Sequence, residues 1–396
     1  MGLRIAILSN AYKPSISGVV TSISLFRRGL IDLGHDVHIF APKVEDYEDQ
    51  EPYVFRLPAL IDLSKSYDIS LALPLKRPMR QIIQGIKPHL IHSQHPVLLG
   101  DLATMYAQEL DLPLVFTFHT YYDNYLKHNV PIISDWVGQM AREVVQNYLD
   151  NCTHIIVPTK SAERVIYQEY KVNAPVSVLP TPIDQAQYRC LDPGPVCREH
   201  QLQDKCVLLY LGRISQEKNL GMLLEAFATL AGEYTQLVLM VVGRGPYSDT
   251  LQELAESLHI QDQVIFVGAV PHDRVSHYMA AADLFVFPSP SETQGLVLLE
   301  ALAAGTPVIA VDSLGAQDIL AERECGLLVP DDRERFADAI RSLLNCPERM
   351  SKMRQSAISI AQDYSVPKAA ERLLSIYEAA LIRGSRVTTS NVFGIS

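Results

Sequence analysis

Short apolar runs alternate with longer segments of helical periodicity along the whole chain of 396 residues. This alternation is typical of parallel sheets whose strands are joined by helices on both faces. In the first half, strands are expected at 4–8, 37–40, 90–92, 114–118, 155–157 and 176–179. In the second half, they are expected at 207–211, 237–242, 264–267, 284–287, 308–311 and 326–329. Each half is therefore predicted to be an α/β fold built on a Rossmann-like sheet.

The length and one proline-containing segment predict how the chain divides. A chain of this size is too long for one typical core and suits two domains. Residues 179–184 contain Pro180 and Pro182, which interrupt any helix or strand there. We therefore expect one Rossmann-like domain over 1–182, a second over 183–364, and a C-terminal segment over 365–396. That segment is predicted to be a helix near 366–382 followed by a frayed tail rich in Ser and Thr.

Composition and charge narrow the class of protein. A hydrophobic content of 48% and a charged content of 20% are typical of globular proteins. The formal net charge of −11 argues against nucleic-acid binding. Residues 1–182 hold 16 Lys and Arg against 18 Asp and Glu, and the remainder holds 18 against 27. Five of the N-terminal acids lie in 45–51, where one solvated loop is expected, so the rest of that half is mildly basic.

Cysteine spacing and apolar runs predict the compartment. The six cysteines form no Cys-x-x-Cys pair and no zinc spacing with the twelve histidines, so free thiols in a reducing compartment are expected. No apolar run reaches the roughly 18–20 residues of a membrane span. Residues 1–8 lead directly into a strand without a signal-peptide pattern. We expect a cytoplasmic protein that can bind the inner face of a membrane.

Two carboxylates, Glu292 and Glu300, lie eight positions apart after the expected strand 284–287. Glu292 is in a loop, and Glu300 is inside a helix that begins near Gly295. A strand, a loop with glycine and a helix N-terminus form an anion site, because the first turn leaves backbone N–H groups unpaired. A loop Glu would repel a ligand that is only a phosphate, but it can accept hydrogen bonds from sugar hydroxyls. The pattern predicts a nucleotide-sugar site.

Two cations, Arg213 and Lys218, flank the turn after the expected strand 207–211. A leaving diphosphate gains negative charge as a glycosidic bond breaks, so fixed cations there stabilise the transition state more than the ground state. No Asp-x-Asp ligand motif occurs, and two cations with helix N-termini neutralise a diphosphate, so neither a metal ion nor another cofactor is expected. The alternative is two ordinary strand–helix loops with surface charges.

Together, Gly212-Arg213-x4-Lys218 and Glu292-x7-Glu300 resemble the retaining glycosyltransferase family with the GT-B fold, which includes sucrose and mannosyl transferases. The resemblance covers nearly the whole chain. It implies two Rossmann-like domains facing a central cleft, a final helix that crosses back onto the first domain, and an α-glycoside of retained configuration. The nucleotide-sugar site that it implies in the second domain consists of Arg213, Lys218, Glu292, Thr293, Gln294, Gly295, Leu296 and Glu300.

The first domain contributes Gly18 and His119 to this interpretation. Gly18 opens the first expected helix, where the absence of a side chain lets the backbone approach a phosphate. His119 follows the strand 114–118, so it is placed at the carboxyl edge of the sheet, where ligands bind. The resemblance implies that His119 contacts the transferred sugar; the alternative is a histidine bonded to nearby backbone. A structural role is favoured for His92, His95 and His128.

Three further segments indicate the acceptor. Thr293-Gln294 stand where Gly-Phe is commoner in the family, and this departure, with 12–22 and 119–125, resembles the bacterial 1,2-diacylglycerol 3-α-glucosyltransferases. That resemblance implies glucose transfer from UDP-glucose to membrane diacylglycerol. Tyr122 and Tyr125 are candidates for contact with the acceptor, with packing as the alternative.

Residues 75–87 hold four cations and no acid. Their apolar side chains share one helical face, so the helix could lie on anionic lipid or could cover the sheet; these side chains are Met79, Ile82, Ile83 and Ile86. Other functions also remain open. They are mannosyl transfer from GDP-mannose to phosphatidylinositol or a soluble sugar, a sugar-nucleotide 2-epimerase, and a non-catalytic sugar-nucleotide-binding protein.

Overall fold

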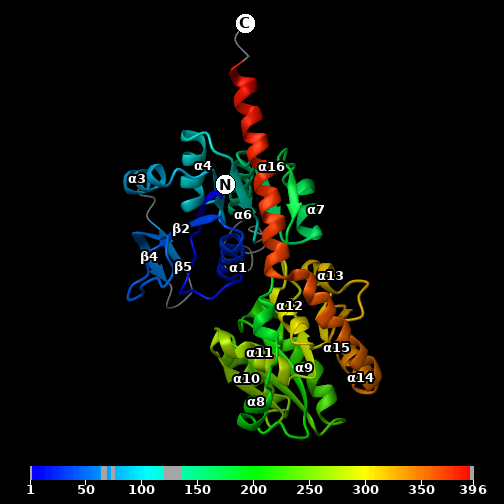
Figure 1. The fold of residues 1–396 in the computed structure, drawn as a ribbon. Coiled ribbons are helices and arrows are strands. Elements are labelled where there is room, and N and C mark those ends of the chain that lie inside the picture. Colours follow the sequence, from blue (N-terminus) through cyan, green and yellow to red (C-terminus); the bar gives the residue numbers. More distant parts are fainter. Residues whose placement is uncertain (1, 64–68, 73–75, 120–134, 393–396) are drawn as a thin grey trace. The chain divides into compact units, whose positions relative to one another are not determined.

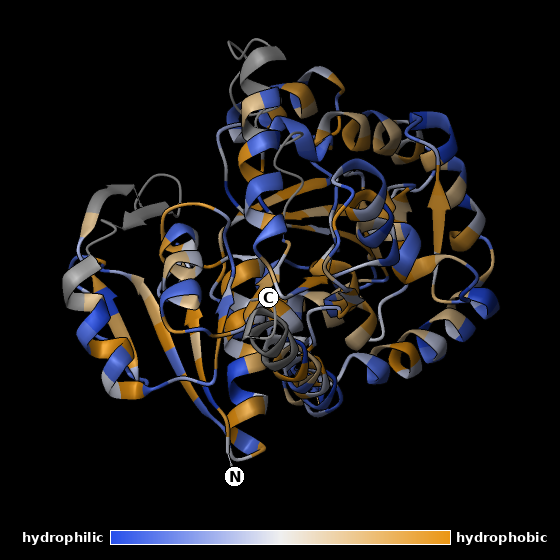
Figure 2. Ribbon diagram, turned by 90° about the horizontal axis from the view of Figure 1, so that it is seen from above, coloured by the Kyte–Doolittle hydropathy of each residue, from blue (hydrophilic) through white to orange (hydrophobic). Residues whose placement is uncertain are grey.

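The computed structural model describes residues 2–63, 69–72, 76–119 and 135–392 (Figure 1). By its internal contacts the chain divides into two compact units. Unit 1 consists of Met1–Pro182 and Val366–Ser396, and unit 2 consists of Ile183–Ser365. Each unit has its own parallel sheet and its own hydrophobic core. The strands are mostly hydrophobic, while the helices alternate hydrophobic and hydrophilic residues (Figure 2).

Unit 1 contains a seven-stranded parallel sheet in the order β3-β2-β1-β6-β7-β8-β9. Its strands are β1 (Arg4–Leu8), β2 (Asp36–Pro42), β3 (Val54–Leu57), β6 (Leu90–Ser93), β7 (Leu114–Thr117), β8 (His154–Val157) and β9 (Val176–Val178). A separate antiparallel pair joins β4 (Ala59–Leu63) and β5 (Ile69–Ala72). The helices are α1 (Gly18–Asp32), α3 (Lys76–Ile86), α4 (Leu99–Glu109), α6 (Asp135–Asp150), α7 (Lys160–Glu169) and α16 (Val366–Val392).

Unit 2 contains a six-stranded parallel sheet in the order β12-β11-β10-β13-β14-β15. Its strands are β10 (Cys206–Leu211), β11 (Leu237–Val242), β12 (Val264–Gly268), β13 (Leu284–Phe287), β14 (Val308–Val311) and β15 (Gly326–Val329). Its α-helices are α8 (Gly194–Glu199), α9 (Leu220–Ala231), α10 (Ser248–Ser257), α11 (His272–Ala281), α12 (Leu296–Ala303), α13 (Leu314–Leu320), α14 (Arg333–Leu344) and α15 (Pro347–Ala361). Short 3-10 helices are η1 (Gln185–Tyr188), η2 (Gln216–Lys218) and η3 (Gln362–Tyr364).

The prediction of two parallel α/β sheets is confirmed, and each expected strand is present to within two residues at either end. Sequence reasoning missed β3 and the β4–β5 pair. β3 is a four-residue edge strand that includes a charged residue, Arg56. The Arg56 guanidinium donates to both carboxylate oxygens of Asp49, at 2.8 and 2.6 Å. Such a short, mixed run lacks the periodicity that reveals the central strands.

Helix α16 packs within unit 1 against α1. Gly29 of α1 lies at the close approach, since a Cβ there would be 2.6 Å from the Cβ of Ala370. The Tyr377 ring is fully buried, and its hydroxyl lies 2.8 Å from His92 Nδ1. The helix continues to Val392, beyond the expected end near residue 382.

Helix α3 corrects one interpretation of the basic segment. Met79 and Ile83 are fully buried in the core of unit 1, and Ile82 and Ile86 pack against that core. The possibility that this apolar face lies on lipid is therefore wrong, because its side chains already cover the sheet. Among the described helices, none is both long and apolar enough to cross a membrane.

The acidic segment 45–51 is the loop that its composition suggested, with Glu45, Asp46, Glu48 and Gln50 exposed, but its last residue is paired. Glu51 accepts from Tyr12 Oη and from Lys13 Nζ, both at 2.6 Å, and lies 3.0 Å from Arg27 Nη1. Burial raises the pKa of Glu51, but the hydrogen bonds from Lys13 and Tyr12 outweigh it and lower the pKa below its ordinary value. These contacts attach the segment to the loop between β1 and α1.

Candidate active site

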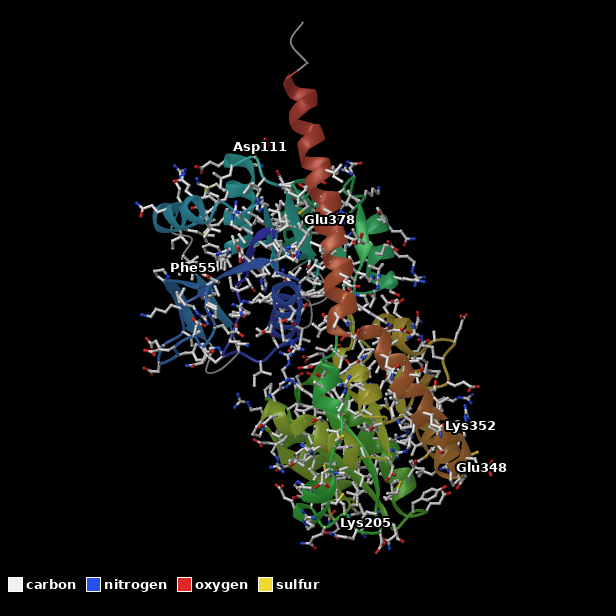
Figure 3. All side chains as sticks on the ribbon, in the orientation of Figure 1. Phe55, Asp111, Lys205, Glu348, Lys352 and Glu378 are labelled. Atoms are coloured by element: carbon white, nitrogen blue, oxygen red, sulfur yellow. The ribbon has the colours of Figure 1, made fainter. Side chains whose placement is uncertain are left out.

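The strand order of unit 2 reverses between β10 and β13. In an open α/β sheet, the carboxyl ends of the strands at such a reversal are the usual ligand site, because the connections diverge there to opposite faces. The loop after β10 carries Arg213 and Lys218, and the loop after β13 carries Glu292. Lys205 precedes β10 and marks the opposite, amino edge of the sheet (Figure 3). A surface depression lined by Lys205 and Asp283 lies at that amino edge, away from these loops.

Lys218 and Glu292 meet across the reversal. Lys218 Nζ donates to Glu292 Oε1 at 2.5 Å, although the two residues are 74 positions apart. Ser289 Oγ donates to the same oxygen at 3.0 Å. The exposed fractions of the Lys218 and Glu292 side chains are 18% and 15%. The two motifs predicted to share a site thus lie in direct contact, and the pair is screened from water enough to be strong.

Arg213 is the more exposed of the two cations, with 54% of its side chain accessible. Its Nη2 donates to Glu217 Oε1 at 2.9 Å, and Ser215 Oγ donates to the same oxygen at 2.6 Å. Burial raises the pKa of Glu217. The hydrogen bond from Ser215 and the charges of Arg213 and Lys218 outweigh this effect, so the pKa lies below its ordinary value. Each cation is therefore paired with a carboxylate. An anionic ligand would have to take the place of that carboxylate to bind the cation.

Glycines hold the Arg213 loop against the loop after β11. Gly212 and Gly243 both have positive φ angles, and a Cβ on Gly243 would lie 1.8 Å from the carbonyl oxygen of Gly212. A Cβ on Gly245 would lie 1.9 Å from the carbonyl oxygen of Ile214. Only glycine permits this backbone packing. Sequence reasoning missed Gly243 and Gly245, although Gly-x-Gly directly after the strand 237–242 was a usable signal.

The N-terminus of α12 follows Gly295, which has a φ of 70°. Gln294 is buried, and Thr293 and Leu296 are partly exposed. The backbone N–H of Gly315 donates to the carbonyl oxygen of Glu292 at 3.1 Å, and a Cβ on Gly315 would be 2.8 Å from that oxygen. The helix α13 therefore holds the Glu292 loop in place, a contact that sequence reasoning did not identify.

Glu300 lies on α12 and is partly exposed. Burial by its neighbours raises the pKa of Glu300 to about 7. The nearby Tyr188 also has a raised pKa, because of its own burial first and then the charge of Glu300. Within the described part of the chain, the Glu300 carboxylate makes no hydrogen bond. A carboxylate in this state is suited to accept hydrogen bonds from a ligand.

The raised pKa of Glu300 predicts a pH-dependent stability. Ionising a group whose folded pKa is about 7 instead of 4.5 costs free energy, so folding is destabilised progressively as pH rises between those values. Glu300→Gln should therefore raise the melting temperature at pH 8 and change it little at pH 4.5. Thermal unfolding of both proteins at the two pH values measures this, and an equal difference at both would contradict the assigned pKa.

In unit 1 the strand order reverses between β1 and β6. Gly18 begins α1, and Ser17 Oγ accepts from Val20 N at 3.3 Å as the helix cap. A Cβ on Gly18 would meet no atom within 4 Å, so the backbone there is open to approach. His119 Nε2 lies 2.7 Å from Oε1 of the buried Gln94, which follows β6. Among the described residues, the hydrogen-bond partner of His119 is therefore a side chain.

The histidines near this edge are uncharged. Burial first, and then the His95 and His92 rings, lower the pKa of His119 to about 3. His92 bonds Thr117 Oγ1 at 2.7 Å as well as Tyr377, so it has the structural role that was expected. His95 Nδ1 accepts from the backbone N–H of Asn10 at 3.1 Å. Gln94 and Asn10 are the polar residues that sequence reasoning missed here.

The remaining predicted residues divide between the two units and the part of the chain outside the described residues. Tyr122, Tyr125 and His128 lie outside the described residues. The nucleotide-side residues belong to unit 2, while Gly18 and His119 belong to unit 1. In the part of the chain that the structure describes, no group of three or more His, Cys, Asp or Glu side chains could hold a metal ion.

Known families and proteins resemble this chain along most of its length. The family model described as Glycosyl transferases group 1 matches residues 198–360, and the one described as Glycosyltransferase Family 4 matches residues 16–187. An alpha-monoglucosyldiacylglycerol synthase of Streptococcus pneumoniae is 32% identical, over 87% of this chain and 79% of that protein. A protein of the same name from Acholeplasma laidlawii is 30% identical, over 78% and 80%. A D-inositol 3-phosphate glycosyltransferase of Acidothermus cellulolyticus is 29% identical, over 76% and 70%.

Solved structures share the fold. Sucrose-phosphate synthase from Thermosynechococcus elongatus superposes with a TM-score of 0.80 at 23% identity, over 95% of this chain and 98% of that chain. Anabaena HepE in complex with UDP-glucose superposes with a TM-score of 0.76 at 18% identity, over 95% and 100%. At these identities the likeness concerns the fold alone, and it confirms the predicted fold class.

Proposed function

Since this chain belongs to the group 1 glycosyltransferases of the GT-B fold, we propose that it transfers glucose from UDP-glucose to membrane diacylglycerol, giving an α-glucosyl diacylglycerol. The observation that carries the donor half is the contact of Lys218 with Glu292 at the reversal of strand order in unit 2. This contact brings together a cation that could bind the diphosphate and a carboxylate that could accept from the sugar hydroxyls. The relatives named as alpha-monoglucosyldiacylglycerol synthases support the acceptor half.

We assign the donor contacts by charge. Arg213 and Lys218 would bind the diphosphate, releasing Glu217 and Glu292 from the pairs that now neutralise them. Glu292 would then accept from the hydroxyls of the sugar. The backbone amides of Gln294–Leu296 at the start of α12 would add partial positive charge. Glu300, which has a raised pKa and makes no hydrogen bond among the described residues, would accept from the ribose hydroxyls as it ionises.

The proposed reaction retains configuration without an enzyme nucleophile. The bond between the sugar C1 and the oxygen of the β-phosphate breaks, and the acceptor hydroxyl oxygen bonds to C1 from the same face. Its proton passes to the departing phosphate oxygen. The cations stabilise the charge that develops on the diphosphate, so the reaction is proposed to need no metal. His119, neutral because of its lowered pKa, would donate or accept a hydrogen bond at the sugar.

We propose that the enzyme works as a peripheral protein at the cytoplasmic face of the membrane. The apolar face of α3 is not available for this, because Met79 and Ile83 are buried. Arg80 and Lys87 remain exposed on or next to that helix, although Arg80 Nη2 pairs with Glu109 Oε2 at 2.7 Å. Attraction of exposed cations to anionic lipid is therefore the proposed contact, and it should weaken as salt rises.

Turnover with defined donors and acceptors tests the function. UDP-glucose and diacylglycerol in anionic vesicles should yield α-monoglucosyl diacylglycerol, with the anomeric proton coupling in NMR reporting the α configuration. Activity should persist in EDTA. A β product would contradict the retaining mechanism. Turnover only of GDP-mannose, or only of a soluble acceptor, would remove the assignment to glucose transfer onto a lipid. If the soluble acceptor is an inositol phosphate, the function would instead match that of the relatives named as D-inositol 3-phosphate glycosyltransferases.

A further inference from the structure

Asn219 connects three loops at the carboxyl edge of the unit 2 sheet. It follows Lys218 directly and joins η2 to α9. Its Nδ2 donates to Asp331 Oδ1 at 2.6 Å, in the loop after β15. The same nitrogen lies 3.4 Å from the carbonyl oxygen of Pro288, at the start of the loop that carries Glu292. One amide group thus contacts the loops after β13 and β15 from the end of the loop after β10.

The backbone conformation of Asn219 limits which residues fit at this position. Its φ of 59° and ψ of 31° lie in the left-handed region, which asparagine and glycine adopt more readily than other residues. Glycine would satisfy the backbone equally well. The asparagine side chain therefore adds something that the turn alone does not require, namely the two contacts across the sheet edge.

We infer that Asn219 and Asp331 form a clamp that positions Lys218 for the diphosphate of the donor, an inference that rests on the proposed function. Lys218 has to release Glu292 when a donor binds, so the pair that now orients its ammonium group is lost at that moment. The bond between Asn219 and Asp331 does not involve the ligand and remains. It keeps the backbone next to Lys218 fixed against the loop after β15 and against the Pro288 end of the Glu292 loop.

The clamp should affect transfer more than donor binding. A displacement of about 1 Å in a group that stabilises developing charge is enough to lower the rate strongly. Asn219→Gly keeps the left-handed backbone and removes both side-chain contacts, so we expect kcat to fall about tenfold while KM for the donor changes less than threefold. Asn219→Asp places two carboxylates side by side and should lose more, about 30-fold or greater.

Reversing the pair provides a rescue. In the double variant Asn219→Asp with Asp331→Asn, the donor and the acceptor exchange places and the hydrogen bond can form again. We expect kcat to recover to within about threefold of the unchanged enzyme. If the kcat of the double variant does not exceed that of Asn219→Asp alone, the clamp is overturned, because the loss of kcat would then not come from the hydrogen bond between residues 219 and 331.

A second cycle separates positioning from folding. If Asn219 acts through Lys218, Asn219→Gly should cost less than twofold in a Lys218→Ala background, whereas a general loss of structure would cost the same tenfold in both. The matched control is Gln236→Ala, which removes an exposed hydrogen bond of 2.8 Å to Lys205 at the amino edge of the same sheet and should leave kcat unchanged.

The outcomes for the clamp and for the proposed function can be told apart. No turnover of diacylglycerol by the unchanged enzyme would refute the acceptor assignment. The clamp is then tested with the donor that the unchanged enzyme does use or hydrolyses. An Asn219→Gly enzyme with unaltered kcat on that donor would overturn the clamp, and a loss confined to the Lys218-containing background would support it.

Discussion

Alanine at Lys218 should lower kcat/KM for the donor by about 100-fold or more, and alanine at Arg213 should lower it by a similar factor. Both cations lie at the reversal of strand order, where a diphosphate would gain charge as the glycosidic bond breaks. Steady-state kinetics with varied donor measures the loss. Near-normal activity in both variants would remove the diphosphate assignment.

The structure also predicts that the two variants differ in stability. The Glu292 side chain is 15% exposed. In Lys218→Ala its carboxylate would keep, among the described residues, the hydroxyl of Ser289 as its hydrogen-bond donor. An uncompensated carboxylate in that position costs free energy, so the melting temperature should fall. Arg213 has 54% of its side chain exposed, and its loss should leave the melting temperature nearly unchanged. Arg341→Ala, at a partly exposed cation on α14 that pairs with Glu233, is the control and should change neither activity nor donor binding.

Alanine at His119 should abolish detectable transfer, with a loss of at least about 100-fold in kcat for any acceptor. The ring is placed at the carboxyl end of β7 and is bonded to the buried Gln94, so its orientation is set before a sugar binds. His272→Ala, at an exposed histidine that begins α11, is the matched control and should keep full activity. More than a tenth of the original activity in His119→Ala would show that the ring does not contact the reacting sugar.

The pH profile adds an independent check on His119. Its pKa is lowered to about 3, mainly by burial, so the ring is neutral at neutral and mildly acidic pH. The pH profile of the activity should therefore contain no inflection near pH 6.5 that is due to His119. Any inflection seen there in the unchanged enzyme should persist in His119→Gln. Because the folded pKa lies below that of the unfolded chain, this group destabilises the fold as pH falls from about 6.5 toward 3. Removing the ring should reduce that acid sensitivity.

Local patterns were sufficient for most of the fold and for the place of the candidate site residues along the chain. Buried parallel strands consist of continuous apolar runs, so β11, β13, β14 and β15 could be bounded to the residue. The strand–loop–helix position of Glu292 and of Lys218 could be predicted because each depends only on its own neighbours in sequence. The basic helix α3 was ambiguous for the same reason, since an amphipathic pattern does not say whether lipid or a sheet covers the apolar face.

The sequence by itself determined the alternation of strands and helices and the chemistry carried by each loop. Tertiary structure alone decided which loops meet. Lys218 contacts Glu292 across 74 positions and Asn219 contacts Asp331 across 112, because the sheet places β10 beside β13 and brings the ends of all its strands to one edge. The glycines of the loops after β10 and β11 are needed only because those loops pack backbone to backbone. Strand order is a property of the assembled sheet, so no window of the sequence contains it.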